Sequence, residues 1–351
     1  MKRTVFGIVA LLFFIVIVPA AFAGDDVAGA PRFNPSLRVG CAFDAAETHY
    51  AFNIETPGGF GGIGGVTRID VTRPSEARFY LGTELPFAVT DRLTVAVGAD
   101  WAFTGAENEI GAIYSDGLGW ISWDRDGRSD WVTADFLVSY ALLKDTGIVK
   151  ELSAVAGVRW DYQTMALDNP HNVLGINSGP GNTVDFRMQR LAPVFGIDCT
   201  FTGIKSDIWG GDVKLGVLAG PVVWGTVDYR ESFATPSFYR MKGDLSHGYI
   251  VRVSGEATVL SGPIAPGLDA SLSLFVDYTH STVNDQIRGT RVPLVGAISE
   301  SQIGFETTGD IVVFGLDASL AFDLWGRPKP VSPAPAPAPP IEPKIEPMSQ
   351  N

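Results

Sequence analysis

Several residue types that define common protein classes are scarce in this chain. Two cysteines in 351 residues exclude a fold held together by a disulfide framework. Basic residues are outnumbered, with 26 Lys and Arg against 39 Asp and Glu, so nucleic acid is excluded as a partner. Beyond the first 23 residues no apolar run approaches the roughly 18 residues of a membrane helix. Only four histidines offer imidazole chemistry: His49, His171, His247 and His280.

One acidic run resembles a calcium-binding loop and one glycine-rich run resembles a phosphate-binding loop, but each lacks essential residues of such a loop. The acidic run 124–130 lacks the third early ligand and the distal Glu of a calcium loop. The glycine-rich run 57–65 has no Lys and no helix signal after it, as a phosphate loop would require. We therefore expect neither a metal nor a cofactor.

The first 23 residues have the order of a secretory signal peptide. Lys2 and Arg3 precede an apolar stretch over 5–18, and the small-residue pattern Ala21-Phe22-Ala23 follows. Gly24 comes next instead of Cys, so a lipid anchor is not indicated. The pattern predicts export through the inner membrane of a diderm bacterium.

A period-two alternation runs through most of the remaining chain. Between Val312 and Leu324 every even position is apolar, whereas the odd positions include Asp317, Ser319 and Asp323. Such alternation is typical of β-strands with one apolar face. It predicts ten strands, at about 37–54, 76–88, 92–103, 131–143, 151–165, 184–203, 211–230, 246–260, 268–281 and 300–324.

The joins between these strands alternate between short and long. Long joins are expected at 55–75, 104–130, 166–183, 231–245 and 282–299. Short turns at one rim, long loops at the other and an even strand count are typical of an outer-membrane barrel. The sequence therefore predicts an all-β, monomeric, antiparallel up-and-down barrel over 24–325, located in the outer membrane. A soluble β-sandwich, which would also alternate, is the alternative.

The polar face of such a barrel points inward, because lipid contacts the apolar face. Six charged residues are expected in the narrow lumen of ten strands. They form either a polar conduit or a salt-bridged core that satisfies itself. These lumen residues are Glu84, Asp135, Arg159, Lys214, Arg252 and Glu256.

Between about residues 118 and 231 the chain resembles the omptins, a family of outer-membrane proteases. The segment Phe186 to Gly196 is similar to an aromatic and basic strand entry of that family, with its Pro and Gly in register. Ala156-Gly157, Trp224 and the acidic run 123–126 also look omptin-like. The resemblance implies a ten-stranded barrel that extends well above the membrane.

Omptin chemistry requires an Asp pair on one wall and an Asp-x-His on the other, which together activate a water. The segment 225–232 after Trp224 contains acids but no His, and Trp120 and Ser122 occupy the best register for the Asp pair. We therefore expect a non-enzymatic protein that binds or adheres through its extracellular loops. The alternatives are an endopeptidase with a rearranged site and a narrow pore. If a site exists, its candidate residues are Asp124, Asp126, Asp228 and His171.

The resemblance also implies a contact with lipopolysaccharide at the outer rim. Arg187 and Gln189 lie on the outward parity of their strand, and Arg190 lies beside them. Trp160 and Tyr162 fit this role or an interfacial aromatic belt. Lipid and lipopolysaccharide are thus expected partners, together with an unidentified extracellular ligand.

The remaining predictions concern the two cysteines and the end of the chain. Cys41 and Cys199 fall on the outward face of strands across the barrel, so we expect them to stay unpaired. Residues 326–351 contain nine prolines and should form an extended, disordered periplasmic tail. The tail is a spacer or a tether to a periplasmic partner. Phe322 or Trp325 would be the aromatic residue that the outer-membrane assembly machinery reads.

Overall fold

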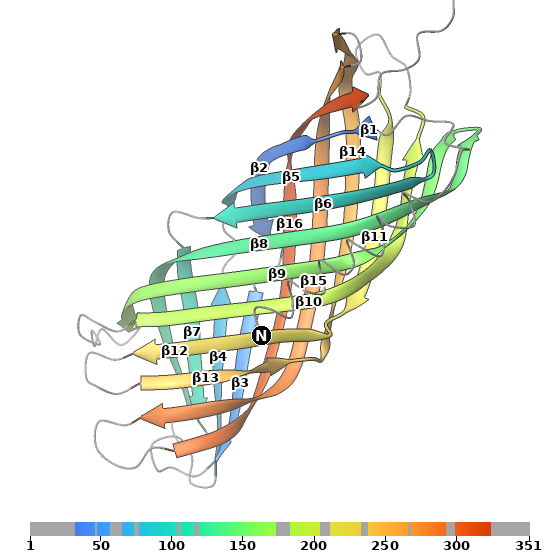
Figure 1. Cartoon of the computed structure of the whole chain (residues 1–351). Coiled ribbons are helices and arrows are strands. Elements are labelled where there is room, and N and C mark those ends of the chain that lie inside the picture. Colours follow the sequence, from blue (N-terminus) through green and yellow to red (C-terminus); the bar gives the residue numbers. More distant parts are fainter. Residues whose placement is uncertain are drawn as a thin grey trace, which may run out of the picture.

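The fold is seen in a computed structural model of the chain (Figure 1). It describes residues 32–45, 48–56, 65–73, 77–103, 107–115, 119–172, 183–203, 211–232, 238–265, 268–292 and 299–323. The predicted signal peptide (1–23) and Pro-rich tail (326–351) lie outside the described residues. Within the described part, no helix has the length and apolar character needed to span a membrane.

The barrel is a closed ring of ten antiparallel segments, and we call each segment a wall. Five of these walls are single long strands. They are β8 (Gly119–Thr146), β9 (Val149–Asn172), β10 (Thr183–Phe201), β15 (Leu268–Val292) and β16 (Ser299–Asp323). The short β1 (Arg32–Phe33) extends the first wall at its start and pairs with β16 and β5.

The other five walls each consist of two strands in succession. They are β2 (Ser36–Asp44) with β3 (Thr48–Thr56), β4 (Gly65–Arg73) with β5 (Arg78–Ala88), β6 (Leu93–Phe103) with β7 (Glu107–Ser115), β11 (Val213–Pro221) with β12 (Trp224–Ser232), and β13 (Phe238–Leu245) with β14 (Gly248–Ala265).

The barrel closes between the last wall and the first. Strand β16 pairs with β2 from Ile311–Asp44 to Ser319–Ser36, and with β3 from Ile303–Ile54 to Thr308–His49. Among the strands that the structure describes, closure leaves no open sheet edge around the ring, as a lipid environment would require. The predicted all-β, ten-stranded antiparallel barrel is confirmed.

Two of the predicted short turns lie within the described residues, and much of the predicted long loops is strand. A tight turn joins β8 to β9, and the turn near Thr90 and Asp91 joins β5 to β6. Gly147, with a φ of 65°, supplies the left-handed conformation that the first of these turns needs. At the opposite end, β7 and β8 occupy most of the expected loop 104–130, and β9 continues through the expected loop residues Asp168 to Asn172.

The loops were overestimated because the apolar face of each wall changes sides half-way along it. In the first half of β15, Leu274 and Val276 point outward and are exposed. In its second half, Gln286 and Arg288 are exposed, whereas Val283 and Ile287 are buried inside. The strand continues with the same pleat while its polarity inverts. An apolar outward face therefore identifies only half of each wall.

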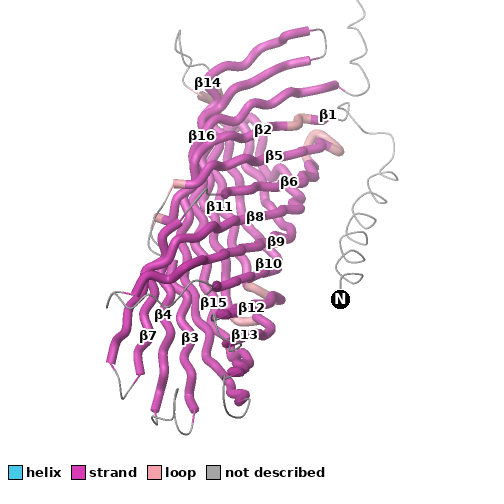
Figure 2. Tube along the Cα trace, turned by 90° about the vertical axis from the view of Figure 1, so that its left-hand side faces the viewer, coloured by secondary structure: helices cyan, strands magenta, loops and turns pink. Residues whose placement is uncertain are grey.

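This inversion divides the barrel into two halves, which we call the belt half and the distal half. The belt half comprises β2, β5, β6, β11 and β14 with the adjoining parts of the five long strands. The distal half comprises β3, β4, β7, β12 and β13 with the remaining parts. Figures 1 and 2 show the two groups at opposite ends of the tilted barrel.

The belt half carries the apolar exterior. Large exposed side chains on it include Leu81, Val97, Leu142, Ile197, Leu215, Val253, Leu274 and Leu316. The distal half instead has an apolar interior. Its buried cluster includes Tyr50, Phe52, Met165, Phe186, Met188, Val227, Tyr229, Met241, Ile287, Ile303 and Phe305.

A buried carboxylate hydrogen-bonds the backbone at the point where β13 ends and β14 begins. Asp285 of β15 accepts hydrogen bonds from the backbone N–H groups of Ser246 (2.7 Å) and His247 (2.9 Å). The imidazole Nδ1 of His247 lies 2.6 Å from the same carboxylate. Burial alone would raise the pKa of Asp285, but these hydrogen bonds outweigh it and hold the pKa below its ordinary value. The carboxylate thus satisfies two N–H groups that leave the ladder here.

Candidate functional site

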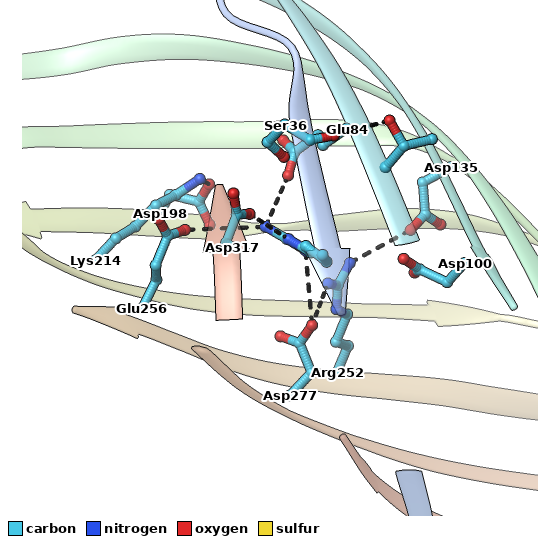
Figure 3. A network of polar contacts seen from close by, with 12 residues as sticks. Ser36, Glu84, Asp100, Asp135, Asp198, Lys214, Arg252, Glu256, Asp277 and Asp317 are labelled. Atoms are coloured by element: carbon cyan, nitrogen blue, oxygen red, sulfur yellow. Dashed lines mark hydrogen bonds and ion pairs between the residues drawn. The ribbon is translucent and has the colours of Figure 1, made fainter. Parts of the chain in front are cut away.

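The interior of the belt half holds a network of charged side chains (Figure 3). Arg38 Nη2 lies 3.0 Å from Glu84 Oε2. Arg159 and Arg252 share Asp135, at 3.0 and 3.3 Å. All six residues that the sequence analysis assigned to the lumen lie in this region: Glu84, Asp135, Arg159, Lys214, Arg252 and Glu256.

The network also contains acids and an arginine that the sequence analysis did not select. Arg38 bonds Asp317 at 2.7 Å, and Arg252 bonds Asp277 at the same distance. Asp198 pairs with Lys214 at 3.2 Å. The signal was available, because these residues have the opposite parity to apolar neighbours such as Val39, Val276 and Leu316.

An apolar layer seals the network on its distal side. Tyr80 packs against Phe275 with ring centroids 5.7 Å apart, and the Arg38 guanidinium lies 5.4 Å from the Phe275 ring. Trp131 belongs to the same buried layer, and the Arg159 guanidinium lies 5.9 Å from its ring. The apolar core of the distal half follows this layer. The belt-half lumen is therefore closed toward the distal end by packed side chains.

A cavity of about 350 Å³ remains between the network and the opposite rim. Its wall includes network residues such as Arg38, Lys214 and Asp277. It also includes Lys150 and Glu151, which follow the tight turn between β8 and β9 at that rim. The belt half thus contains a charged vestibule that starts at the short-turn rim and ends at the apolar layer.

Asp228, one of the candidate catalytic residues, lies on the exterior of the distal half. Its carboxylate accepts two hydrogen bonds from Arg240, from Nε at 3.0 Å and from Nη2 at 2.6 Å. This pairing raises the pKa of Arg240. The neighbours Val227 and Tyr229 are the residues that point inward. Asp228 therefore faces away from any interior site.

The strand register brings two of the other candidates together. Asp124 of β8 is the Cα partner of His171 of β9, and Asp126 is the partner of Asp168. A register shift lies between the two pairs. The sequence analysis placed His171 in a loop, whereas the structure places its backbone in β9. The side chains of these four residues lie outside the described part.

Two other histidines pair with acids from neighbouring strands. His247 contacts Asp285, as described above, and His280 Nδ1 lies 2.7 Å from Asp310 Oδ1. Tyr278 also donates a hydrogen bond to Asp310. Both acids are far from their histidines in sequence, so local spacing could not reveal these pairs. Within the described residues, no group of three or more His, Cys, Asp or Glu gathers as a metal site.

The residues expected to contact lipopolysaccharide point in different directions. Arg187 is exposed and Gln189 is half-buried on the exterior parity of β10. Arg190 instead points inward, is 1% exposed, and pairs with the buried Asp161 at 3.0 Å. Because Arg190 cannot reach lipid, we drop it from the expected contact. Trp160 and Tyr162 lie half-buried on the outward parity of β9 and stack with centroids 5.8 Å apart.

Arg187 belongs to a group of basic residues on the exterior, which we call the basic band. In cross-strand register, Arg187 pairs with Asp228, Asp228 with Lys242, and Lys242 with Arg288. The next row is Asp185, Arg230 and Arg240. The band thus contains five basic side chains and two acidic ones, on β10, β12, β13 and β15. The sequence analysis missed Arg240, Lys242 and Arg288 because they fell in the expected loops 231–245 and 282–299. Arg230 ended the expected strand 211–230 but was not selected as a candidate.

The two cysteines lie on separate strands of the belt half. Cys41 of β2 is exposed, Cys199 of β10 is half-buried, and neither is in a disulfide. Cys41 pairs in register with Phe79 and Phe314, whereas Cys199 pairs with Leu152 and Leu215. Different neighbours on both sides place the two residues in different parts of the ring.

No family model and no curated protein matches the sequence. Among solved structures, the chain is similar to the outer membrane protease OmpT from Escherichia coli, with a TM-score of 0.59, 10% identity, and coverage of 83% of this chain and 96% of that one. A match to the outer membrane protein OprG from Pseudomonas aeruginosa has a TM-score of 0.34, 12% identity, and coverage of 84% and 99%. The chain therefore has an omptin-like fold, a closed β-barrel with a ring of ten antiparallel strands.

Proposed function

We propose that the protein is a non-enzymatic surface-binding barrel whose basic band binds phosphate groups of outer-leaflet lipopolysaccharide. One observation carries this proposal: the distal half has an apolar core inside, and the five basic side chains of the basic band lie on its outside. Its exterior is therefore the surface on which a ligand would find charge. An extracellular ligand of the loops remains part of the proposal, as does recognition by the assembly machinery and by a periplasmic partner of the tail.

The position and charge of the basic band fit an anionic headgroup. Five basic residues against two acidic ones leave an excess of three positive charges on neighbouring strands. Trp160 and Tyr162 lie next to β10 on the same exterior, in the position expected of an interfacial aromatic pair. Arg and Lys hold phosphate oxygens through charge-assisted hydrogen bonds. Asp228 orients the Arg240 guanidinium within the band.

The placement of one catalytic candidate, Asp228, supports a non-enzymatic role. Asp228 faces the exterior, and the interior at its level is filled by residues such as Val227 and Tyr229. A water-activating set would need its acids and imidazole to converge on one open cavity. Asp228 therefore cannot act together with groups inside the barrel.

Binding of purified lipopolysaccharide to protein refolded in detergent micelles tests the proposal. Replacing Arg187 and Lys242 with alanine should weaken binding roughly 30-fold, at about 1 kcal/mol for each cation near an anionic surface. The matched control replaces Arg92 and Lys144 at the opposite rim, which removes the same charge. Unchanged affinity in the first variant, or an equal loss in the control, would contradict the proposal.

A second candidate function is an endopeptidase with a rearranged site, favoured by the register of Asp124 and His171. Residues directly opposite in an antiparallel pair have Cβ atoms about 5 Å apart, close enough for a carboxylate and an imidazole to interact. Cleavage of a peptide library by whole cells that express the protein tests this alternative. Cleavage that disappears in Asp124→Asn and His171→Gln would establish it over the binding function.

A further inference from the structure

The charged vestibule of the belt half contains more carboxylates than basic groups. Its lining includes seven acidic residues and four basic ones. The acids are Glu84, Asp100, Asp135, Glu151, Asp198, Glu256 and Asp277, and the basic residues are Arg38, Lys150, Lys214 and Arg252. Arg159 and Asp317, which join the network from behind the cavity wall, cancel each other. An excess of three negative charges therefore surrounds a cavity of about 350 Å³.

Two carboxylates of this cavity are held less closely by basic residues than the other acids of the network. Glu256 lies 3.9 Å from Arg38, has Lys214 as its cross-strand partner, and has a side chain that is 28% exposed. Asp100 accepts hydrogen bonds from the neutral hydroxyls of Tyr80 (2.5 Å) and Thr133 (3.1 Å), and Arg252 is a cation that interacts with it electrostatically. A charge inside a narrow lumen is poorly solvated, so an external cation gains more there than at an open surface.

The excess charge is spread along the vestibule. In Figure 3, Asp198 and Glu256 lie on one side of the network and Asp100 and Asp135 on the other. No three acids or histidines of the described residues gather closely enough to hold one metal ion. Separated carboxylates match a flexible chain of separated ammonium groups better than a compact ion. The cavity reaches the rim at Lys150 and Glu151, which gives such a molecule an entry.

We propose that the belt-half vestibule is a binding site for a linear oligoamine that carries about three positive charges and enters from the short-turn rim. Its ammonium groups take the positions of the missing cations, donating hydrogen bonds to Glu256 at one side and Asp100 at the other. The apolar layer around Tyr80 and Phe275 ends the site, so the molecule is held in the vestibule and does not pass through the barrel. The site is separate from the basic band, which lies on the opposite half and on the outside.

Calorimetric titration of spermidine into lipopolysaccharide-free protein, refolded as the full mature chain in micelles, tests the site. We expect one spermidine per barrel, and affinity lower by roughly tenfold for each carboxylate removed in Glu256→Gln and Asp100→Asn. Each amide keeps the shape of the side chain and one acceptor oxygen, and replaces the other oxygen by an NH2 donor. A heat-modifiable shift on gel electrophoresis checks that each variant folds.

The control is the double variant Glu300→Gln and Glu306→Gln, which removes two exposed charges from β16 in the distal half. It should bind spermidine as the unmodified protein does. An equal loss of affinity in this control would show non-specific attraction and overturn the site, as would the absence of saturable binding. Equal affinity for hexaamminecobalt(III), a compact trivalent cation, would overturn the oligoamine class.

Discussion

The two halves of the barrel place their apolar and charged side chains on opposite faces of the sheet. In the belt half, Leu274 and Val276 face outward and Asp277 lies in a salt-bridged interior. In the distal half of the same strand, Arg288 faces outward and Ile287 packs in an apolar core. The pleat does not change between them, so the surroundings select which face is apolar. The contrast indicates that lipid surrounds the first half and water the second.

The contrast also explains how the interior is stabilised in each half. The belt half has few apolar side chains to bury inside, and its interior is held by the ion pairs around Arg38 and Arg252. The distal half buries aromatic residues such as Phe52 against Tyr229 and Phe305, with centroids 5.0 and 5.1 Å apart. It is built like the interior of a water-soluble protein.

The strongest expected effect comes from removing a side chain from the distal core. Phe52 is fully buried, so Phe52→Ala should lower the free energy of unfolding by about 3–5 kcal/mol. Val276→Ala, on the exposed face of the belt half, creates no cavity inside the protein and should cost much less. Urea unfolding of the refolded protein in micelles measures both. Similar losses would remove the proposed difference between the halves.

A buried ion pair at the junction of the halves should be nearly as sensitive. Arg190→Ala leaves the buried Asp161 without its cation and should cost about 3–5 kcal/mol of unfolding free energy. Arg240→Ala removes an exposed partner of Asp228 and should cost about 1 kcal/mol or less. The same unfolding measurement compares the two variants. A small effect at Arg190 would show that water reaches this pair.

The same charged substitution should have different effects on the exterior of the two halves. Leu215→Arg places a charge in the apolar belt and should cost about 2–4 kcal/mol if the site lies near the bilayer midplane. Thr226→Arg lies on the exterior of the distal half, on the continuation of the same wall, and should stay within about 0.5 kcal/mol. Unfolding in phospholipid vesicles is the suitable measurement. Equal costs would contradict a boundary between these two positions.

The smallest effect concerns Asp285 at the break between β13 and β14. Asp285→Ala should cost about 1.5–3 kcal/mol, because a charged acceptor is lost to two backbone N–H groups. Since the folded-state pKa is depressed, this contribution is present above the unfolded pKa of about 3.9 and is lost as the pH falls through the folded value. Unfolding from pH 7 to pH 3 checks this. A variant as acid-sensitive as the unmodified protein would contradict the assignment.

The alternation predicted the ring but not the full length of its strands, several of which were expected to end in long loops. Period-two patterns with apolar outward residues, such as Val312, Phe314 and Leu316, marked every wall because lipid imposes that face. The strands of the distal half do not show this pattern, because their apolar residues, such as Ile303 and Phe305, point inward. The breaks at 222–223 and 246–247 also interrupt two of the predicted strands, and the sequence analysis did not anticipate them.

The candidate site was predictable only where strand parity decides it. Glu84, Asp135 and Arg252 could be assigned to the lumen from their neighbours in the sequence. Arg190 was misplaced because parity was not applied to it, although its neighbours Arg187 and Gln189 were placed correctly. Pairs such as Asp228 with Arg240, or His280 with Asp310, join different strands and require the register of the folded barrel.

Spin-label accessibility along β15 tests the boundary between the halves most directly. In a background where Cys41 and Cys199 are replaced by serine, labels are attached in vesicles at outward positions from Leu274 to Arg288. Labels at Leu274 and Val276 should collide with oxygen, which concentrates in lipid, and labels at Gln286 and Arg288 with a water-soluble nickel complex. The crossover should fall between Val276 and Gln286. Oxygen-dominated collisions at both Gln286 and Arg288 would contradict the account, because the distal half would then also lie in the membrane.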